Sequence, residues 1–387
     1  MLEYFISKKH ILERKKQSII SIVGIMIGIL VLTVSIGISN GLNKNMINSV
    51  LSISSHVLIN EQNPIVDYKK VIQDIEKIKG VKGAVASVPF QGLLKYKNEY
   101  NAENIVGMKI QGFDFKSAKK AMDLNKKIIA GEISENRDSI LIGSEYALNT
   151  GIGLGEVVTL ISPDGKEIKF KVSGVFKTGY YDYDNSVAMI NLESAQYITY
   201  STNSINEINI TLDNPYNADK IANKISNEYG FRNRTWGELN KNLLTALSLE
   251  KSVMIILFSL IVVIAGFVVW VTLNMLVKEK IKDIGIMRAM GFSKTNIMRI
   301  FLFQGLILGS IGIILGILIS LAILWYIKNY SIPGISSIYY IKAIPIEISI
   351  KEILMISGAN FVVILCSSIF PAYLAAGLET QEALKYE

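Results

Sequence analysis

Cysteine, histidine and nucleotide-binding motifs are nearly absent from this 387-residue sequence. Cys366 is the one cysteine, so a disulfide within the chain is excluded. The two histidines, His10 and His56, belong to segments that we expect on opposite sides of a membrane, which leaves no credible histidine-based metal site or Ser/His relay. No G-x-x-x-x-G-K-[ST] stretch occurs, so the chain does not bind ATP through a P-loop. These absences argue against a catalytic site.

Charged residues are absent from four long windows. The windows are Gln17–Asn43, Ser252–Val277, Ile300–Ile327 and Ile353–Leu378. Each is longer than the roughly 20 residues that a helix needs to cross a hydrocarbon core of about 30 Å, so the sequence predicts four transmembrane helices. Basic residues before the first window also suit a signal peptide. However, the apolar run is too long and no A-x-A-like cleavage site follows it, which favours an uncleaved anchor.

Positive charge is unevenly distributed along the chain. Residues 43–250 contain 24 basic and 24 acidic residues, whereas residues 1–16 contain five and two, and residues 278–299 six and two. Positive flanks mark the cytoplasmic side of a membrane protein. We therefore expect the N-terminus and residues 278–299 inside the cell and residues 43–250 outside. No basic patch interleaved with aromatic residues supports nucleic-acid binding, the other interpretation of a high pI.

The large external segment mixes strand and helix patterns. "SHVLIN" and "EINITL" alternate and are rich in strand-forming residues, and "VVTLISPDGKEIKFKVSGVF" predicts two strands around a Pro-Asp-Gly turn. "DYKKVIQDIEKIKGV" and "NADKIANKISNEYGF" have helical spacing, with helix ends at Gly80 and Gly230. We therefore predict a membrane α-helical fold with four spans and a large extracytoplasmic α+β domain.

The chain divides accordingly. The expected parts are a cytoplasmic N-terminal segment (1–16), spans at 17–42, 252–277, 300–327 and 353–378, an extracytoplasmic domain (43–250), a cytoplasmic loop (278–299), an extracytoplasmic loop (328–352) and a cytoplasmic tail (379–387). Almost no ionisable residue lies within the spans, which disfavours an ion or proton relay.

Two further patterns leave alternatives open. In "TGYYDYDNS", Asp182 and Asp184 suit either a cation site or a polar turn between strands. Glycines three or four residues apart let helices approach closely, either within one chain or at a dimer contact. These glycines are Gly24, Gly28 and Gly37 in the first span and Gly305, Gly309, Gly312 and Gly316 in the third.

The segment between the second and third spans contains a short helix of its own, "KDIGIMRAMG", which ends at Gly291 before a cap at Ser293. Its charges, on Lys282, Asp283 and Arg288, are scattered around the helix, whereas a helix lying on lipid gathers them on one face. The apolar residues between them are Ile284, Met287 and Met290. The pattern indicates a helix that docks in a groove of another protein, and an ordinary cytoplasmic hairpin is the alternative.

The same region carries a family resemblance. "AGFVVWVTLNMLVKEKIKDIGIMRAMGFSKTNIMRIFLFQGLILGSIGIILG" resembles the signature of type VII ABC-transporter permeases, the MacB/FtsX/Lol group, and within it the lipoprotein-releasing permeases of the LolC/LolE type. "SIGISNGLNKNMINSVLSISSHVLI", "SILIGSEYALNTGIGLGEVVTLISPDG" and "FPAYLAAGLETQEALKYE" are similar to other parts of that family, in the same order. The resemblance covers nearly the whole chain and implies a MacB-like periplasmic core domain.

The resemblance implies that the short helix is a coupling helix, which docks in a groove of a separate ABC ATPase subunit. Two copies of that ATPase would use ATP and magnesium, while this chain would bind no cofactor and have no catalytic site of its own. The candidate contact residues are Glu279, Asp283, Ile284, Met287, Arg288, Met290 and Gly291.

The resemblance also implies a dimer, with a second copy or a relative, around a cavity that receives lipoprotein acyl chains. The candidate cavity residues are Asn40, Gly41, Ile256 and Leu260. In that family a long hairpin of one permease type recruits a soluble periplasmic carrier. Residues 163–168 predict a tight turn at that place, so this chain looks like the hookless, LolE-like member or hands its cargo on differently.

We therefore expect a permease subunit of an ATP-driven lipoprotein-releasing transporter in the bacterial inner membrane, with both termini cytoplasmic. One alternative is MacB-like export of peptides or drugs, although that family carries a fused ATPase. Another is FtsX-like signalling to a cell-wall hydrolase, whose external domain is usually much smaller. A membrane-anchored enzyme is a third, weakened by the lack of a catalytic constellation.

Overall fold

The computed structural model describes residues 2–97, 103–330 and 345–378. The chain forms two compact units, one made of Met1–Lys44 and Ala246–Glu387 and the other of Asn45–Thr245. The expected tail 379–387 and most of the expected loop 328–352 lie outside the described residues.

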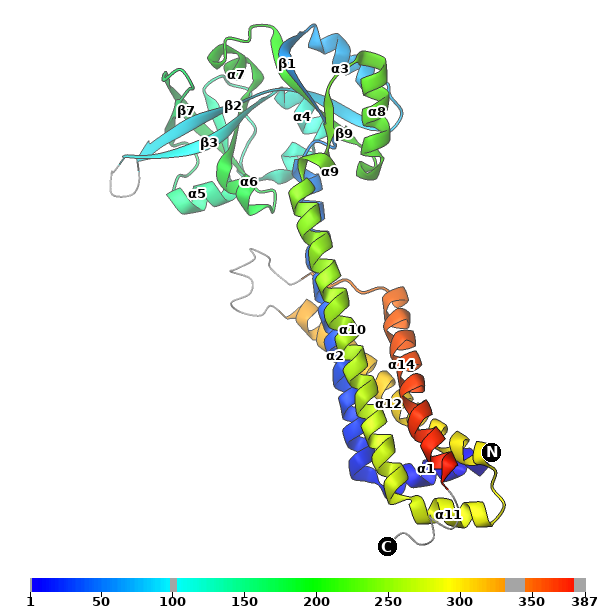
Figure 1. Ribbon diagram of the computed structural model, residues 1–387. Helices are drawn as coiled ribbons and strands as arrows, with labels where there is room; N and C mark the ends of the chain where they lie inside the picture. The colour runs from blue at the N-terminus through cyan, green and yellow to red at the C-terminus, as the bar shows by residue number, and fades with distance from the viewer. Residues whose placement is uncertain (1, 98–102, 331–344, 379–387) are drawn as a thin grey trace. The chain divides into compact units, whose positions relative to one another are not determined.

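The first unit is helical (Figure 1). Its helices are α1 (Leu2–Glu13), α2 (Lys15–Ile53, which continues into the second unit), α10 (Lys241–Glu279, which begins there), α11 (Ile281–Ala289), α12 (Lys294–Asn329) and α14 (Ile350–Gly377). Among the described residues four of these helices, α2, α10, α12 and α14, are long and apolar enough to cross a membrane. The predicted four-helix membrane fold is therefore confirmed.

Helices α2 and α10 are longer than the charge-free windows that predicted them. Each has 39 residues, or about 58 Å at 1.5 Å per residue, whereas the hydrocarbon core is about 30 Å thick. A charge-free window marks the part of a helix that suits lipid, and backbone hydrogen bonding continues into the polar sequence beyond it. For that reason α2 extends past the expected boundary at residue 42, and α10 begins before residue 252.

Glycines lie where the spanning helices touch. A Cβ on Gly309 of α12 would lie 2.7 Å from Ile364 Cγ2 of α14, and a Cβ on Gly312 would lie 2.8 Å from Ile25 Cβ of α2. The other glycines of these faces also meet a neighbouring span: Gly24 and Gly28 meet α10, Gly37 meets α12, Gly305 meets α14 and Gly316 meets α2. Of the two alternatives for these glycines, packing within one chain is the one observed.

The described residues of the second unit form one ten-stranded sheet with short helices around it (Figure 1). The strands are β1 (Val57–Val66), β2 (Val81–Lys97), β3 (Glu103–Phe113), β4 (Ile128–Gly131), β5 (Ser139–Gly143), β6 (Val157–Ile161), β7 (Glu167–Phe176), β8 (Val187–Asn191), β9 (Ser204–Leu212) and β10 (Asn233–Thr235). The helices are α3 (Tyr68–Glu76), α4 (Phe115–Ala121), α5 (Ser144–Thr150), α6 (Tyr181–Ser186), α7 (Leu192–Ile198), α8 (Ala218–Tyr229) and α9 (Trp236–Leu239). The predicted α+β class is confirmed.

Six of the strands close into a small barrel. The pairs run from β2 to β3, β8, β5, β7 and β6, and β6 pairs with β2 again. Leu94, Ile110, Leu160 and Phe170 are almost fully buried in the core that these strands share. The same core continues under α3 and α8, which end before Gly80 and Gly230 in the left-handed region, at φ of 97° and 73°.

The β6–β7 connection is a tight turn, as the sequence predicts. The Ser162 backbone N–H donates to the Lys166 carbonyl at 3.0 Å, and Gly165 has a φ of 84° that favours glycine. No long hairpin lies at this place in the described chain.

Candidate functional site

Helix α11 is a separate short helix between the second and third spans. Gly291 follows it with a φ of 97°, in the left-handed conformation that commonly ends helices. The Ser293 hydroxyl then accepts a hydrogen bond from the Asn296 backbone N–H at 3.2 Å and caps α12. Both boundaries agree with the sequence prediction.

One side of α11 is buried in this chain's own core. Ile284 is 0% exposed and Met287 is 7% exposed. Both belong to a cluster that includes Phe301 of α12 and Ala375 of α14. Since neither side chain is accessible, the prediction that they contact an ATPase directly needs correction: in this structure they fix α11 to the spans.

The opposite side of α11 presents the apolar residues Ile286 and Met290. The sequence prediction did not include Ile286, and it did not separate Met290 from the buried residues of the helix. Ile286 is 49% exposed and Met290 is 67% exposed. Lys282 and Ala289 are also exposed, and the four positions share one helical face by their spacing of four, seven and eight residues. The i, i+4 pair of Ile286 and Met290 was the available signal, but the sequence did not reveal which apolar face turns outward.

The acidic candidates of this region are engaged within the chain. Glu279 Oε2 pairs with Arg14 Nε at 3.2 Å. Lys280 Nζ lies 2.8 Å from both Glu13 Oε2 and Asp283 Oδ2. Burial opposes the charge on Lys280, but its hydrogen bonds to Asp283 and Glu13 prevail and raise the pKa of Lys280. These contacts tie the start of α11 to the end of α1, so we assign Glu279 and Asp283 to bracing.

Arg288 braces the other end of α11. Its Nη1 donates to the Phe292 carbonyl at 3.2 Å, across the turn formed by Gly291. Its Nε is buried and has no hydrogen-bond partner among the described residues. The guanidinium therefore holds the turn with part of its hydrogen-bonding capacity unused.

Helix α1, which the sequence reading treated as a plain cytoplasmic segment, packs on the third span. The Ser7 hydroxyl donates to the Ile300 carbonyl of α12 at 2.7 Å, and both Ser7 and His10 are buried. Burial, and then the nearby Lys280 ammonium, lowers the pKa of His10. Helix α11 is thus held by α1, α12 and α14 together.

The four candidate cavity residues have two different environments. Asn40 Nδ2 donates to Glu352 Oε1 at 2.7 Å, and a Cβ on Gly41 would lie 1.8 Å from the Pro345 carbonyl oxygen. Asn40 therefore contacts the first turn of α14, and Gly41 lies against the segment that precedes it. Ile256 and Leu260 of α10 are 69% and 57% exposed, so no other described segment of this chain covers them, and their place in an acyl-binding cavity stays a prediction.

The outer end of α2 is fixed inside the second unit. His56 Nδ1 accepts a hydrogen bond from the Leu212 N–H at 2.9 Å, and its Nε2 lies 3.3 Å from the Leu51 carbonyl oxygen, which requires a neutral ring. Lys127 Nζ donates to the Ser52 carbonyl, where the helix macrodipole favours a cation. Burial lowers the pKa of Lys127 to about 8. Residues 45–53, the last part of α2, are thus held within the second unit by its own residues.

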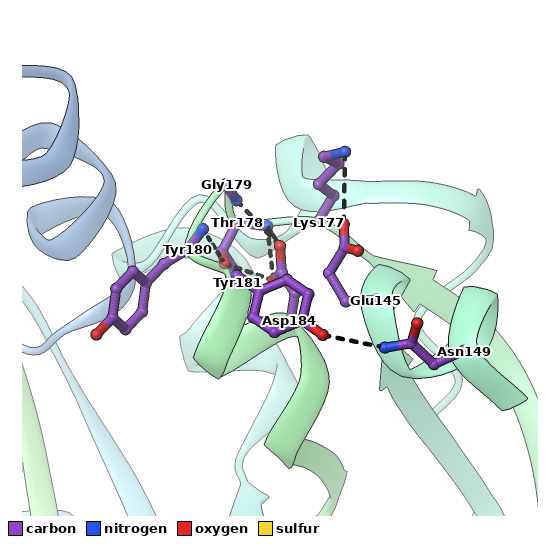
Figure 2. A network of polar contacts seen from close by, with 8 residues as sticks. All are labelled: Glu145, Asn149, Lys177, Thr178, Gly179, Tyr180, Tyr181 and Asp184. Atoms are coloured by element: carbon purple, nitrogen blue, oxygen red, sulfur yellow. Dashed lines mark hydrogen bonds and ion pairs between the residues drawn. The ribbon is translucent and has the colours of Figure 1, made fainter. Parts of the chain in front are cut away.

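The aspartates of "TGYYDYDNS" do not form a cation site in the described chain. Asp184 is buried, and its carboxylate accepts hydrogen bonds from the Thr178 and Gly179 backbone N–H groups at 2.9 and 3.1 Å (Figure 2). Burial raises the pKa of Asp184. No group of three His, Cys, Asp or Glu side chains suited to a metal occurs among the described residues. The segment is also the short helix α6 and not a simple turn.

The described chain has one span before a large α+β unit and three spans after it, and a short helix, α11, is held between the second and third spans. This arrangement is that of a polytopic membrane protein of the permease class. The FtsX-like permease C-terminal family matches residues 255–380, and the MacB-like periplasmic core domain family matches residues 18–228. The second match covers more than half of the chain. The chain therefore belongs to the family of ABC-transporter permeases with a MacB-like periplasmic core domain.

Curated relatives extend along the full length of the chain. The lipoprotein-releasing system transmembrane protein LolC of Neisseria meningitidis is 26% identical over 100% of this chain and 99% of its own length. The corresponding LolE of Haemophilus influenzae is 26% identical over 98% of each. Among solved structures, the periplasmic region of MacB from Actinobacillus actinomycetemcomitans covers 50% of this chain and 94% of its own, with 12% identity and a TM-score of 0.36.

Proposed function

We propose that this protein is a permease subunit of an ATP-driven transporter that releases lipoproteins from the outer leaflet of the inner membrane. The observation that supports this most is its full-length similarity to the lipoprotein-releasing LolC and LolE proteins. The four spans and the large α+β unit agree with the role.

In this proposal α11 is the coupling helix, and its exposed face docks on a separate ATPase subunit. Ile286 and Met290 offer an apolar anchor pair, and Lys282 adds a charge at the rim. The buried face, with Ile284 and Met287, joins α11 to α12 and α14, so a displacement of α11 would move the spans as well. Two ATPase copies, which bind ATP and magnesium themselves, would drive a dimer of permease chains.

The cargo site is a cavity between two permease subunits, formed by a second copy or a relative. Ile256 and Leu260 contribute an apolar wall to it. Burial of each CH₂ group is worth about 0.8 kcal/mol, so the extraction of a multi-acyl anchor costs tens of kcal/mol. That cost requires both ATP-driven closure and an apolar acceptor, such as a soluble periplasmic carrier. The tight turn at 163–168 supports a hand-over without a hook hairpin.

In the proposed orientation the N-terminus, α11 and the C-terminus are cytoplasmic and the second unit is periplasmic. The basic flanks at residues 1–16 and 278–299 support it. A membrane-impermeant thiol probe should label Asp164→Cys from outside the cell and should leave Lys294→Cys unlabelled. Reversed labelling would overturn the orientation and the docking role of α11.

A reconstituted release assay tests the function. The permease with its ATPase is placed in proteoliposomes with a fluorescent acylated lipoprotein, and ATP-dependent transfer to a soluble acceptor is measured. Leu260→Arg should abolish transfer while the ATPase stays bound, because a charge in an acyl cavity costs a few kcal/mol. Leu318→Arg on α12 is the matched control, since Leu318 is 59% exposed and Leu260 is 57% exposed. Wild-type transfer by Leu260→Arg would refute the cavity assignment.

A further inference from the structure

A groove runs between the second and fourth spans, away from the residues assigned to ATPase and cargo. It has a volume of about 720 Å³. Its apolar walls are Trp270, Val271 and Met275 of α10 with Phe370 and Leu374 of α14. Asn274 also lines the groove, which ends at Lys278 and Glu279. Lys278 is eight residues after Trp270 and therefore about 12 Å further along α10. That length is most of the roughly 15 Å of hydrocarbon in one leaflet of a bilayer about 30 Å thick.

The end of the groove presents an available positive charge. Lys278 is exposed and forms no ion pair with a described residue. Both carboxylate oxygens of the neighbouring Glu279 have partners elsewhere. Its Oε1 accepts a hydrogen bond from Gln17 Nε2 at 3.2 Å, and its Oε2 forms an ion pair with Arg14 Nε at 3.2 Å. Lys280 is occupied by Glu13 and Asp283. Lys278 therefore differs from the two charged residues that follow it in being free to bind an anion.

We propose that this groove binds one anionic phospholipid of the cytoplasmic leaflet, with an acyl chain along the apolar walls and the headgroup phosphate at Lys278. The leaflet rests on the orientation in the proposed function. An apolar channel that ends in a cation at the membrane surface matches the two parts of such a lipid. The aromatic walls at Trp270 and Phe370 are stiff, so little side-chain freedom is lost when the chain enters.

A second copy of this protein fits the groove less well. A copy seated on this groove around a two-fold axis would bring the same surface of both chains together, so both Lys278 side chains would add positive charge to one interface. The adjoining residues 278–299 carry six basic and two acidic side chains in each copy, which adds to the repulsion. An anionic headgroup removes this repulsion. Lys278 is two residues before Lys280, whose ion pair with Glu13 holds α11 to α1. A phosphate bound at Lys278 would therefore add negative charge close to that ion pair.

Lipid retention by the full-length protein tests the proposal. The chain is purified from nanodiscs of equal phosphatidylglycerol and phosphatidylcholine, and the retained lipids are quantified by mass spectrometry. The wild type should retain phosphatidylglycerol selectively, and Lys278→Gln should lower that selectivity about fivefold, since one lysine near the surface is worth about 1 kcal/mol. Val271→Trp should fill the groove and remove both lipids. Lys294→Gln, at an exposed lysine outside the groove, should leave the selectivity unchanged.

Three results would overturn the proposal. The first is unchanged selectivity in Lys278→Gln, with Val271→Trp still retaining lipid. The second is a disulfide between copies through Met275→Cys in a Cys366→Ala background, which would assign the groove to a dimer interface. The third is outside labelling of Lys278→Cys, which would move the site to the other leaflet and refute the proposed orientation separately. If the wild type retains phosphatidylglycerol selectively but transfers no lipoprotein, the proposed function fails while the lipid groove stands.

Discussion

Two isoleucines of α11 that are two residues apart should differ in what alanine does to them. Alanine at Ile284 should lower folding stability, and alanine at Ile286 should weaken ATPase binding. Ile284 is 0% exposed and packs against α12 and α14, whereas Ile286 is 49% exposed. Ile284→Ala removes buried methyl groups and leaves a cavity, which costs about 2–5 kcal/mol of folding free energy. Ile286→Ala removes partly exposed groups, so its effect on stability should stay within about 0.5 kcal/mol.

The order should reverse for binding of the ATPase. Loss of an apolar anchor from a docking groove costs about 2 kcal/mol, or roughly a thirtyfold weaker Kd. Ile286→Ala and Met290→Ala should show that loss, and Ile286→Asp should abolish binding because it places an unpaired charge in the groove. Thermal unfolding and the Kd for the ATPase, measured in the same detergent, check both halves. If Ile286→Asp binds the ATPase as tightly as the wild type, the docking face is assigned wrongly.

Three further substitutions test individual contacts. Gly309→Val places methyl groups against Ile364 and should destabilise the spans by about 1–3 kcal/mol. Gly358→Ala, whose Cβ would have nothing within 4 Å, should stabilise them. Equal melting temperatures for the two variants would contradict the close contact at Gly309. Burial keeps the folded pKa of His56 below its usual value near 6.5, so the unfolded state binds the proton first and stability falls as the pH drops through that value. The protection factor of the Leu212 amide, which is its intrinsic exchange rate divided by its observed rate, should therefore fall between pH 7.5 and 5.5, and a protection factor that does not change with pH would count against this role of His56. Asn40→Ala removes the hydrogen bond to the Glu352 carboxylate and should lower the melting temperature, at a cost of about 1 kcal/mol. An unchanged melting temperature would show that this hydrogen bond does not stabilise the helices.

The sequence predicted the features that depend on composition or on one residue's conformation. Charge-free windows located all four spans, since lipid excludes unpaired charge wherever the neighbouring helices lie. Gly291 and Ser293 set the limits around α11 through local backbone and capping preferences. The turn at 163–168 followed from Pro-Asp-Gly chemistry in the same way.

The sequence could not predict which face of α11 is buried. Apolar residues occur all around this helix, so their periodicity favours no side, and only packing against α12 and α14 separates Ile284 from Ile286. The same limit applies to Glu279, whose partner Arg14 lies more than 260 residues away in sequence. Asn40 was placed in the cargo cavity by resemblance, whereas its structural partner Glu352 belongs to the start of the fourth span.

Lipoprotein sorting in cells depleted of this protein tests the central claim most directly. Membranes are separated after depletion, and acylated lipoproteins are quantified in the inner and outer fractions, with cell-wall cleavage and drug resistance recorded in parallel. The proposed function predicts that lipoproteins accumulate in the inner membrane, and that Leu260→Arg gives the same accumulation with the ATPase still attached. Normal sorting on depletion, with a change in cell-wall cleavage or drug resistance, would contradict lipoprotein release and favour a signalling or exporting permease.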